Sequence, residues 1–200
     1  MAEVKQIVVG TYQTNCYILI DNGHAIIIDP GKKEERIIAN IPSDITVDAI
    51  CLTHGHFDHI QAVDKLHEYY HCPIYLDTDD EVLVKHCKYN QMDGYNGSIA
   101  YDTHPYDFPV TKINNFELEI IKASGHTEGS CLILYQNMMF AGDVIFKGSV
   151  GRTDLYLGNE SNMRQSLKLI KTLDPNYVIY PGHGEITTLA DELKYNYYLL

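Results

Sequence analysis

Residues 53–59 read Thr-His-Gly-His-Phe-Asp-His and place four potential metal ligands within six positions. The segment follows an apolar stretch and precedes an amphipathic one, so we expect it to join a buried strand to a helix. In an extended chain His54 and His56 project to the same side. Asp58 and His59 then lie at the turn into the helix and can face a second point. Asp58 at such a turn can also serve only as a helix N-cap.

Three more potential ligands follow expected strands, each next to glycine: His126 in Ser-Gly-His-Thr, Asp143 in Ala-Gly-Asp and His183 in Pro-Gly-His-Gly. A single histidine beside glycine is more often a hydrogen-bonded turn residue. Recurrence of ligand-type residues at strand ends favours one shared site, because sites in layered α/β folds assemble there. The whole set offers only nitrogen and oxygen, which suits zinc and also accepts iron or manganese.

The elements that position these residues follow from short β-branched or aromatic runs for strands and from one-sided apolar spacing for helices. Strands are predicted at 7–10, 16–21, 25–29, 47–53, 73–76, 116–121, 131–135, 138–141 and 177–180, and helices at 32–40, 59–70, 78–89, 160–173 and 188–199. Residues 90–109 are polar and interrupted by glycine and proline, which predicts a long loop of the kind that is often functional. Strand-rich blocks followed by helices predict two packed sheets with helices outside. Periodicity alone also fits other mixed α/β layouts.

Composition narrows the class of protein. The chain has 200 residues, of which 45% are hydrophobic and 21% charged, as expected for a single globular domain over 1–200. Five cysteines without a Cys-x-x-Cys pair favour reduced thiols. No secretory signal or membrane-spanning run is visible, so we expect a cytoplasmic protein without a membrane partner. A formal net charge of −12 argues against a nucleic-acid partner. The oligomeric state is not indicated.

The ordered set His-x-His-x-Asp-His, Gly-His, Gly-Asp and Gly-His resembles the metallo-β-lactamase superfamily over nearly the whole chain. The resemblance implies a four-layer αβ/βα sandwich of two mixed sheets with outer helices, and two divalent metal ions at one edge between the sheets. It implies that His54, His56 and His126 hold the first metal. It implies that Asp58, His59 and His183 hold the second and that Asp143 bridges both, with Asp58, Asp143 and His183 as the catalytic residues.

Two such ions, roughly 3.5–4 Å apart, can share a water molecule, lower its pKa and direct the resulting hydroxide at a carbonyl carbon. Asp143 stands where β-lactamases of the thiolate-containing type carry cysteine. The run Gly-Arg-Thr-Asp at 151–154 resembles the short glyoxalase II-like (hydroxyacylglutathione hydrolase-like) thioesterases, which lack an added C-terminal substrate domain. We therefore expect hydrolysis of a small hydroxyacyl thioester with two metal ions, zinc being the expected one.

Contacts with an anionic thiol portion of the substrate are expected from Lys147, Arg152 and Tyr156, which follow the bridging aspartate closely. Arg152 could instead pair only with Asp154 and shape the loop. Two other functions stay open: an iron persulfide dioxygenase of the same fold with one metal per chain, and a non-enzymatic metal-binding module. The ligand residues discriminate poorly between them.

Overall fold

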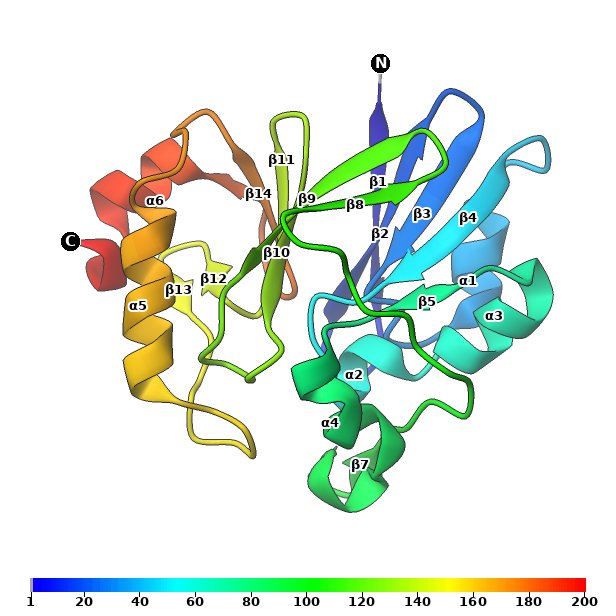
Figure 1. The fold of residues 1–200 in the computed structure, drawn as a ribbon, viewed down its shortest axis with the longest axis horizontal. Coiled ribbons are helices and arrows are strands. Elements are labelled where there is room, and N and C mark those ends of the chain that lie inside the picture. The colour runs from blue at the N-terminus through cyan, green and yellow to red at the C-terminus, as the bar shows by residue number, and fades with distance from the viewer. Residues whose placement is uncertain (1) are drawn as a thin grey trace.

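Two β-sheets pack face to face in the computed structural model, which describes residues 2–200, and helices cover the outer face of each sheet (Figure 1). The helices α1 (Glu34–Ala39) and α3 (Val63–Tyr70) lie outside one sheet, and α5 (Glu160–Ile170) and α6 (Leu189–Tyr195) lie outside the other (Figure 1). This is the four-layer sandwich that the sequence predicts.

The first sheet has the order β1-β2-β3-β4-β5 and comes from the N-terminal part of the chain. Its strands are β1 (Glu3–Val9), β2 (Thr14–Asp21), β3 (His24–Ile28), β4 (Thr46–Cys51) and β5 (Ile74–Tyr75). The first three pair antiparallel, and β4 and β5 are parallel to their neighbours. Asn22 and Gly23 both have positive φ in the β2–β3 turn, as the Asn-Gly pair predicts.

The second sheet has the order β15-β14-β11-β10-β9-β8. Its strands are β8 (Val110–Ile113), β9 (Phe116–Lys122), β10 (Cys131–Tyr135), β11 (Met138–Gly142), β14 (Val178–Pro181) and β15 (Thr187–Thr188). Only the β11–β14 pairing is parallel among them. The strand β8 was not predicted from the sequence, although its exposed and buried residues alternate as in any half-buried strand.

Three apolar layers hold the sandwich together. Alternate residues of β2 face opposite ways: Ile18 packs toward the helices α1 and α3, while Leu19 packs toward the second sheet. Phe140 of the second sheet lies in the layer between the sheets. Met139, its neighbour in β11, packs under α5 against Leu167. The inner strands β2, β10 and β11 are therefore buried on both faces, whereas β8 and β9 keep one face exposed.

Two predicted helices are interrupted. The helix expected over 59–70 is split into α2 (Phe57–Ile60) and α3. The amide of Ala62 donates to the carbonyl of Pro30 at 3.0 Å, so it does not form a hydrogen bond within the helix. The stretch 78–89 contains η1 (Thr78–Asp80), α4 (Glu81–Lys85) and η2 (Cys87–Tyr89). Asp77 caps this stretch by accepting from the amide of Asp79.

The loop expected over 90–109 contains a short hairpin of β6 (Gln91–Met92) and β7 (Tyr95–Asn96). Asp93 and Gly94 form its turn with positive φ, so an Asp-Gly hairpin signal was present in the sequence. A second unpredicted hairpin joins β12 (Ile145–Phe146) to β13 (Ser149–Val150), and η3 (Tyr197–Leu199) follows α6. Along residues 2–200 no helix is long and apolar enough to cross a membrane.

Candidate metal centre

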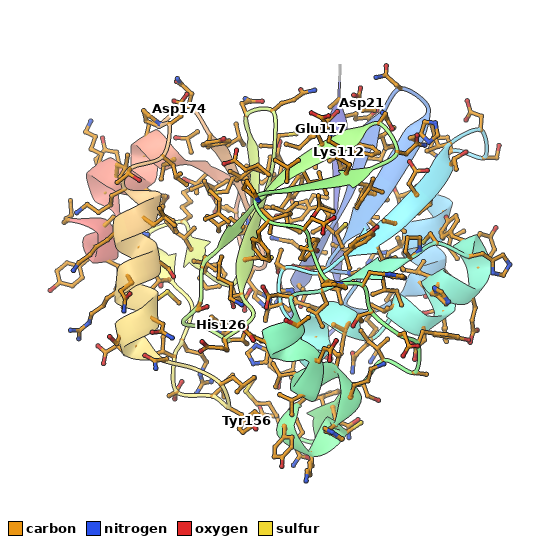
Figure 2. The ribbon with its side chains drawn as sticks, in the orientation of Figure 1. Asp21, Lys112, Glu117, His126, Tyr156 and Asp174 are labelled. Carbon is orange, nitrogen blue, oxygen red and sulfur yellow. The ribbon has the colours of Figure 1, made fainter. Side chains whose placement is uncertain are left out.

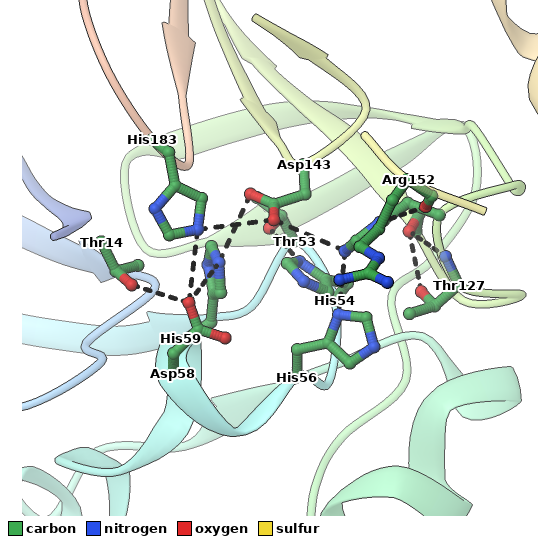
Figure 3. Close-up of polar contacts among 12 residues, drawn as sticks. Thr14, Thr53, His54, His56, Asp58, His59, Thr127, Asp143, Arg152 and His183 are labelled. Carbon is green, nitrogen blue, oxygen red and sulfur yellow. Dashed lines mark hydrogen bonds and ion pairs between the residues drawn. The ribbon is translucent and has the colours of Figure 1, made fainter. Parts of the chain in front are cut away.

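The seven ligand-type residues of the sequence motifs meet at one edge of the sandwich, where strands of both sheets end (Figure 3). The segment between β4 and α2 comes from the first sheet. The loops after β9, β11 and β14 come from the second sheet. The structure brings together the side chains of His54, His56, Asp58, His59, His126, Asp143 and His183.

The first group consists of three buried imidazoles, those of His54, His56 and His126. One nitrogen of each ring lies within 4.8 Å of the others. His56 Nδ1 and His126 Nε2 are 2.8 Å apart, so two rings direct nitrogens at the same point. Three converging nitrogens are a suitable set for a divalent transition metal.

The second group joins the Asp58 carboxylate to His59 and His183, again within 4.8 Å. Asp58 Oδ2 lies 3.3 Å from His183 Nε2 and 3.6 Å from His59 Nε2. Thr14 on β2 donates to the same carboxylate oxygen at 2.8 Å. The N-cap position of α2 is occupied by His56, so Asp58 is not the N-cap here.

Asp143 lies between the two groups. Its Oδ2 is 3.4 Å from His126 Nε2 in the first group, and its Oδ1 is 3.4 Å from His59 Nε2 in the second. The backbone at Gly182 passes so close that a Cβ there would fall 2.1 Å from Asp143 Oδ1. Only glycine therefore lets the loop after β14 approach this carboxylate. This position allows one carboxylate to serve two cations.

Three buried polar atoms in the centre have no hydrogen-bond partner within the described residues: His54 Nε2, His59 Nε2 and Asp143 Oδ1. Burying an unsatisfied polar group costs about 1–3 kcal/mol. His54 belongs to the first group, His59 to the second and Asp143 lies between them, so cations held by the two groups would satisfy these atoms. The site therefore fits divalent metal ions, and its nitrogen and oxygen donors accept zinc, iron or manganese.

Proton affinities differ between the two groups. Burial lowers the pKa of His54 well below its usual value and that of His56 to about 3, aided by the neighbouring imidazoles. These rings are therefore neutral, as metal ligands must be. In the second group Asp143 and Asp58 outweigh burial and raise the pKa of His183 to about 9. Metals entering this group must displace protons, which couples binding to pH.

Outer contacts fix the orientation of the imidazoles. His59 Nδ1 donates to Asp29 Oδ2 at 3.0 Å, His126 Nδ1 to the carbonyl of Arg152 at 2.7 Å, and His183 Nδ1 to the carbonyl of Tyr12 at 3.0 Å. Each contact leaves Nε2 facing the centre, as is usual for metal-binding histidines. Asp29 was not predicted from the sequence as part of the site. Its setting, Asp-Pro-Gly at the end of β3, shows the same strand-end pattern as the other motifs.

Two buried polar side chains anchor the loop that carries His54 and His56. Asp80 accepts from the amides of Gly55 and Gly129 at 2.8 and 2.7 Å, and from Thr127 Oγ1 at 2.7 Å. Asn90 accepts from the amide of Phe57 at 2.7 Å and donates to the carbonyl of Gly55 at 2.7 Å. Neither residue was singled out from the sequence.

A cavity of about 700 Å³ opens beside the centre, and Asp58, Asp143 and His183 form part of its wall. Tyr156 and Arg152, two of the substrate contacts expected from the sequence, also line this cavity. Lys147, the third expected contact, does not line the cavity. Its ammonium group pairs with Glu185.

Arg152 forms the ion pair that the sequence offered as an alternative to substrate contact. Its Nε and Nη2 donate to the two carboxylate oxygens of Asp154 at 2.7 and 2.8 Å. The hydrogen bond from Arg152 lowers the pKa of Asp154 to about 2. The guanidinium is thus paired within its own loop, and Figure 3 shows it beside the histidine cluster.

Comparison with known proteins gives a match to the family described as the metallo-β-lactamase superfamily over residues 9–183. The probable metallo-hydrolase YqgX of Bacillus subtilis (strain 168) is 32% identical, over 98% of this chain and 96% of its own. The hydroxyacylglutathione hydrolase GloC of Haemophilus influenzae is 29% identical, over 98% of this chain and 97% of its own.

Solved structures show the same likeness. The BLEG-1 B3 metallo-β-lactamase superposes with a TM-score of 0.92 at 33% identity, covering 98% of this chain and 99% of its own. TTHA1623 in a di-iron-bound form superposes with a TM-score of 0.89 at 29% identity, covering 98% of this chain and 100% of its own. These likenesses extend over the whole sandwich, including the edge where the seven residues meet.

Proposed function

This chain belongs to the metallo-β-lactamase superfamily and is a metallohydrolase with candidate sites for two metal ions, and from that premise we propose that it hydrolyses a small hydroxyacyl thioester. The observation that carries the proposal is the pair of three-residue groups on either side of Asp143, at the wall of a cavity large enough for a small molecule. Similarity to GloC over nearly the whole chain supports a thioester as the substrate.

We propose that His54, His56 and His126 hold one ion, that Asp58, His59 and His183 hold the other, and that Asp143 contacts both. Zinc is our choice of metal, since the donors are imidazole and carboxylate. When bound, the two ions supply Lewis-acid polarisation of the substrate carbonyl and lower the pKa of a water molecule.

The residues of the chain prepare this chemistry by orientation and charge. Burial opposes ionisation of Asp58, but His59 and His183 outweigh it and lower the pKa of Asp58 to about 2. The ionised carboxylate lies at the cavity wall and can accept a hydrogen bond from the attacking water. The water oxygen bonds to the acyl carbon and gives up a proton, the carbon–sulfur bond breaks, and a proton returns to the sulfur, so that a hydroxy acid and a thiol leave. No oxidation or reduction takes place.

A panel of acyl thioesters tests this function, with thiol release and oxygen consumption measured in parallel. We expect thiol release without oxygen consumption and two metal ions per chain by elemental analysis. Asp143→Asn should abolish thiol release. Asn176→Ala, at an exposed position far from any described side-chain contact of the centre, is the matched control. One iron per chain, with oxygen consumed on a persulfide and no thioester cleaved, would contradict the proposal in favour of a dioxygenase.

A further inference from the structure

Aromatic rings form part of the wall of the cavity beside the metal centre. On one side Tyr12 meets Phe57 edge to face with centroids 5.4 Å apart. On another side Tyr89 stacks on Tyr156 with centroids 4.5 Å apart and planes inclined by 10°. This stack joins two segments far apart in sequence. Such walls favour an apolar stem on the ligand.

Two cations line this cavity, Lys88 and Arg152, and they differ in availability. Arg152 is held by both oxygens of Asp154. Lys88 has no carboxylate within salt-bridge distance in the described part of the chain, residues 2–200. Its Nζ lies 4.5 Å from the centroid of the Tyr89 ring. Of the two cations in the cavity wall, Lys88 is therefore the one that is not paired with a carboxylate and is available to bind an anionic ligand.

The position of Lys88 is set by the metal loop. Lys88 and Tyr89 lie in η2, directly before the buried Asn90. Asn90 is bonded to the backbone of Gly55 and Phe57, on either side of the ligand His56. The segment that carries the cation is thereby tied to the segment that carries the ligands. Figure 2 shows Tyr156, the stacking partner of Tyr89, beside the hairpin of β6 and β7 on the same side of the sandwich as His126.

From this arrangement we propose that Lys88, with the Tyr89–Tyr156 stack, forms the subsite for the part of the substrate remote from the scissile bond, and that this part is an apolar stem ending in a carboxylate. The inference rests on the proposed thioester hydrolase function. It moves the anion contact away from Lys147 and Arg152, where the sequence places it, to a residue without any sequence motif. The stem packs against the two tyrosine rings, and the carboxylate meets the ammonium of Lys88.

Direct binding tests the subsite without relying on turnover. The probe is 8-oxononanoate, a ketone in which CH₂ replaces the sulfur of acetyl-6-mercaptohexanoate, and its neutral counterpart is the primary amide. Dissociation constants are measured by calorimetry on the metal-loaded enzyme. Lys88→Met keeps the length of the side chain and removes its charge. Lys85→Met is the matched control, because Lys85 is nearby in sequence, lies 3.7 Å from Asp102 and does not line the cavity.

We expect Lys88→Met to weaken binding of the carboxylate roughly three- to tenfold. This loss is larger than that of a typical exposed ion pair and smaller than that of a hydrogen bond to a charged group. Binding of the amide should not change, and Lys85→Met should change neither. The difference in carboxylate affinity between wild type and Lys88→Met should become smaller at high salt, because salt screens exposed charges. Tyr156→Leu should weaken both ligands equally, because it removes packing and leaves the charge.

Equal binding of the carboxylate by wild type and Lys88→Met would overturn the subsite, as would a loss that appears with Arg152→Met instead. The KM of acetyl-6-mercaptohexanoate separates this failure from failure of the proposed function. Thioester cleavage with an unchanged KM in Lys88→Met would remove the subsite and keep the hydrolase. Carboxylate binding that depends on Lys88, without cleavage of any thioester, would remove the thioesterase and keep the anion subsite.

Discussion

Asn90→Ala removes a side chain that is 1% exposed and connects the metal loop to α4. The amide oxygen accepts from the backbone of Phe57, and the amide nitrogen donates to the carbonyls of Gly55 and Leu83 at 2.7 and 3.3 Å. Gly55 and Phe57 flank His56. The substitution therefore acts on stability and on the position of a ligand at the same time.

The magnitude follows from the groups left behind. Asn90→Ala leaves the amide of Phe57 and the carbonyl of Gly55 buried without partners, each costing about 1–3 kcal/mol. Some of this cost is recovered where water enters the space of the lost side chain. We expect a loss of about 2–4 kcal/mol in the free energy of unfolding, and a roughly 10- to 100-fold weaker metal affinity, the usual cost of losing support behind ligands.

Urea denaturation of the metal-free protein measures the first quantity, and competition with a chelator measures the second. Asn176→Ala, at an exposed position, is the matched control and should change neither. A loss of stability with unchanged metal affinity would show that Asn90 supports only α4. A change in unfolding free energy below about 0.5 kcal/mol, the range of ordinary surface substitutions, would refute the reasoning altogether.

Three further predictions concern the metal centre and the Arg152–Asp154 pair beside the cavity. Asp143→Asn should lower metal content and activity together. Asp58→Ala should remove mainly the metal ion of the second group, so that elemental analysis finds about one ion per chain. In metal-free protein burial disfavours the charged form of His183, but Asp143 and Asp58 raise its pKa to about 9, above the ordinary 6.5. The stability that this histidine contributes is then fully present below about pH 6.5 and lost as pH rises through about 9. In urea titrations the free energy of unfolding of the wild type should therefore fall, relative to that of His183→Gln, as the pH rises from about 6.5 to 9. The same pH dependence in both proteins would contradict a raised pKa of His183. Arg152→Ala and Asp154→Ala should produce the same defect, with the double variant no worse than either, because the two side chains form one bidentate pair. Additive effects on KM would instead assign Arg152 to the substrate.

Local patterns in the sequence were sufficient to find the candidate ligand residues that the fold brings together and, through the family resemblance, the layered fold. The four ligand-type residues of 53–59 are close in sequence, so their spacing alone predicts that they lie near one another. The short apolar runs of β2 and β10 predict strands that are buried on both faces. The hairpin at Asp93 and Gly94 was also predictable from its turn residues, and was missed only because its strands are two residues long.

Tertiary structure alone decided which side chains support the ligands and which face the substrate cavity. Asn90 and Asp29 lie in segments far from the ligands that they support, and their bonds depend on how β3, β4 and η2 pack. Lys147 and Arg152 looked suitable for an anion by their nearness to Asp143. Each found a carboxylate partner in the folded chain, while Lys88 did not. Sequence patterns report which face of an element is apolar. The pairing of charges between elements depends on contacts among distant residues, and these exist only once the sheets and loops have packed.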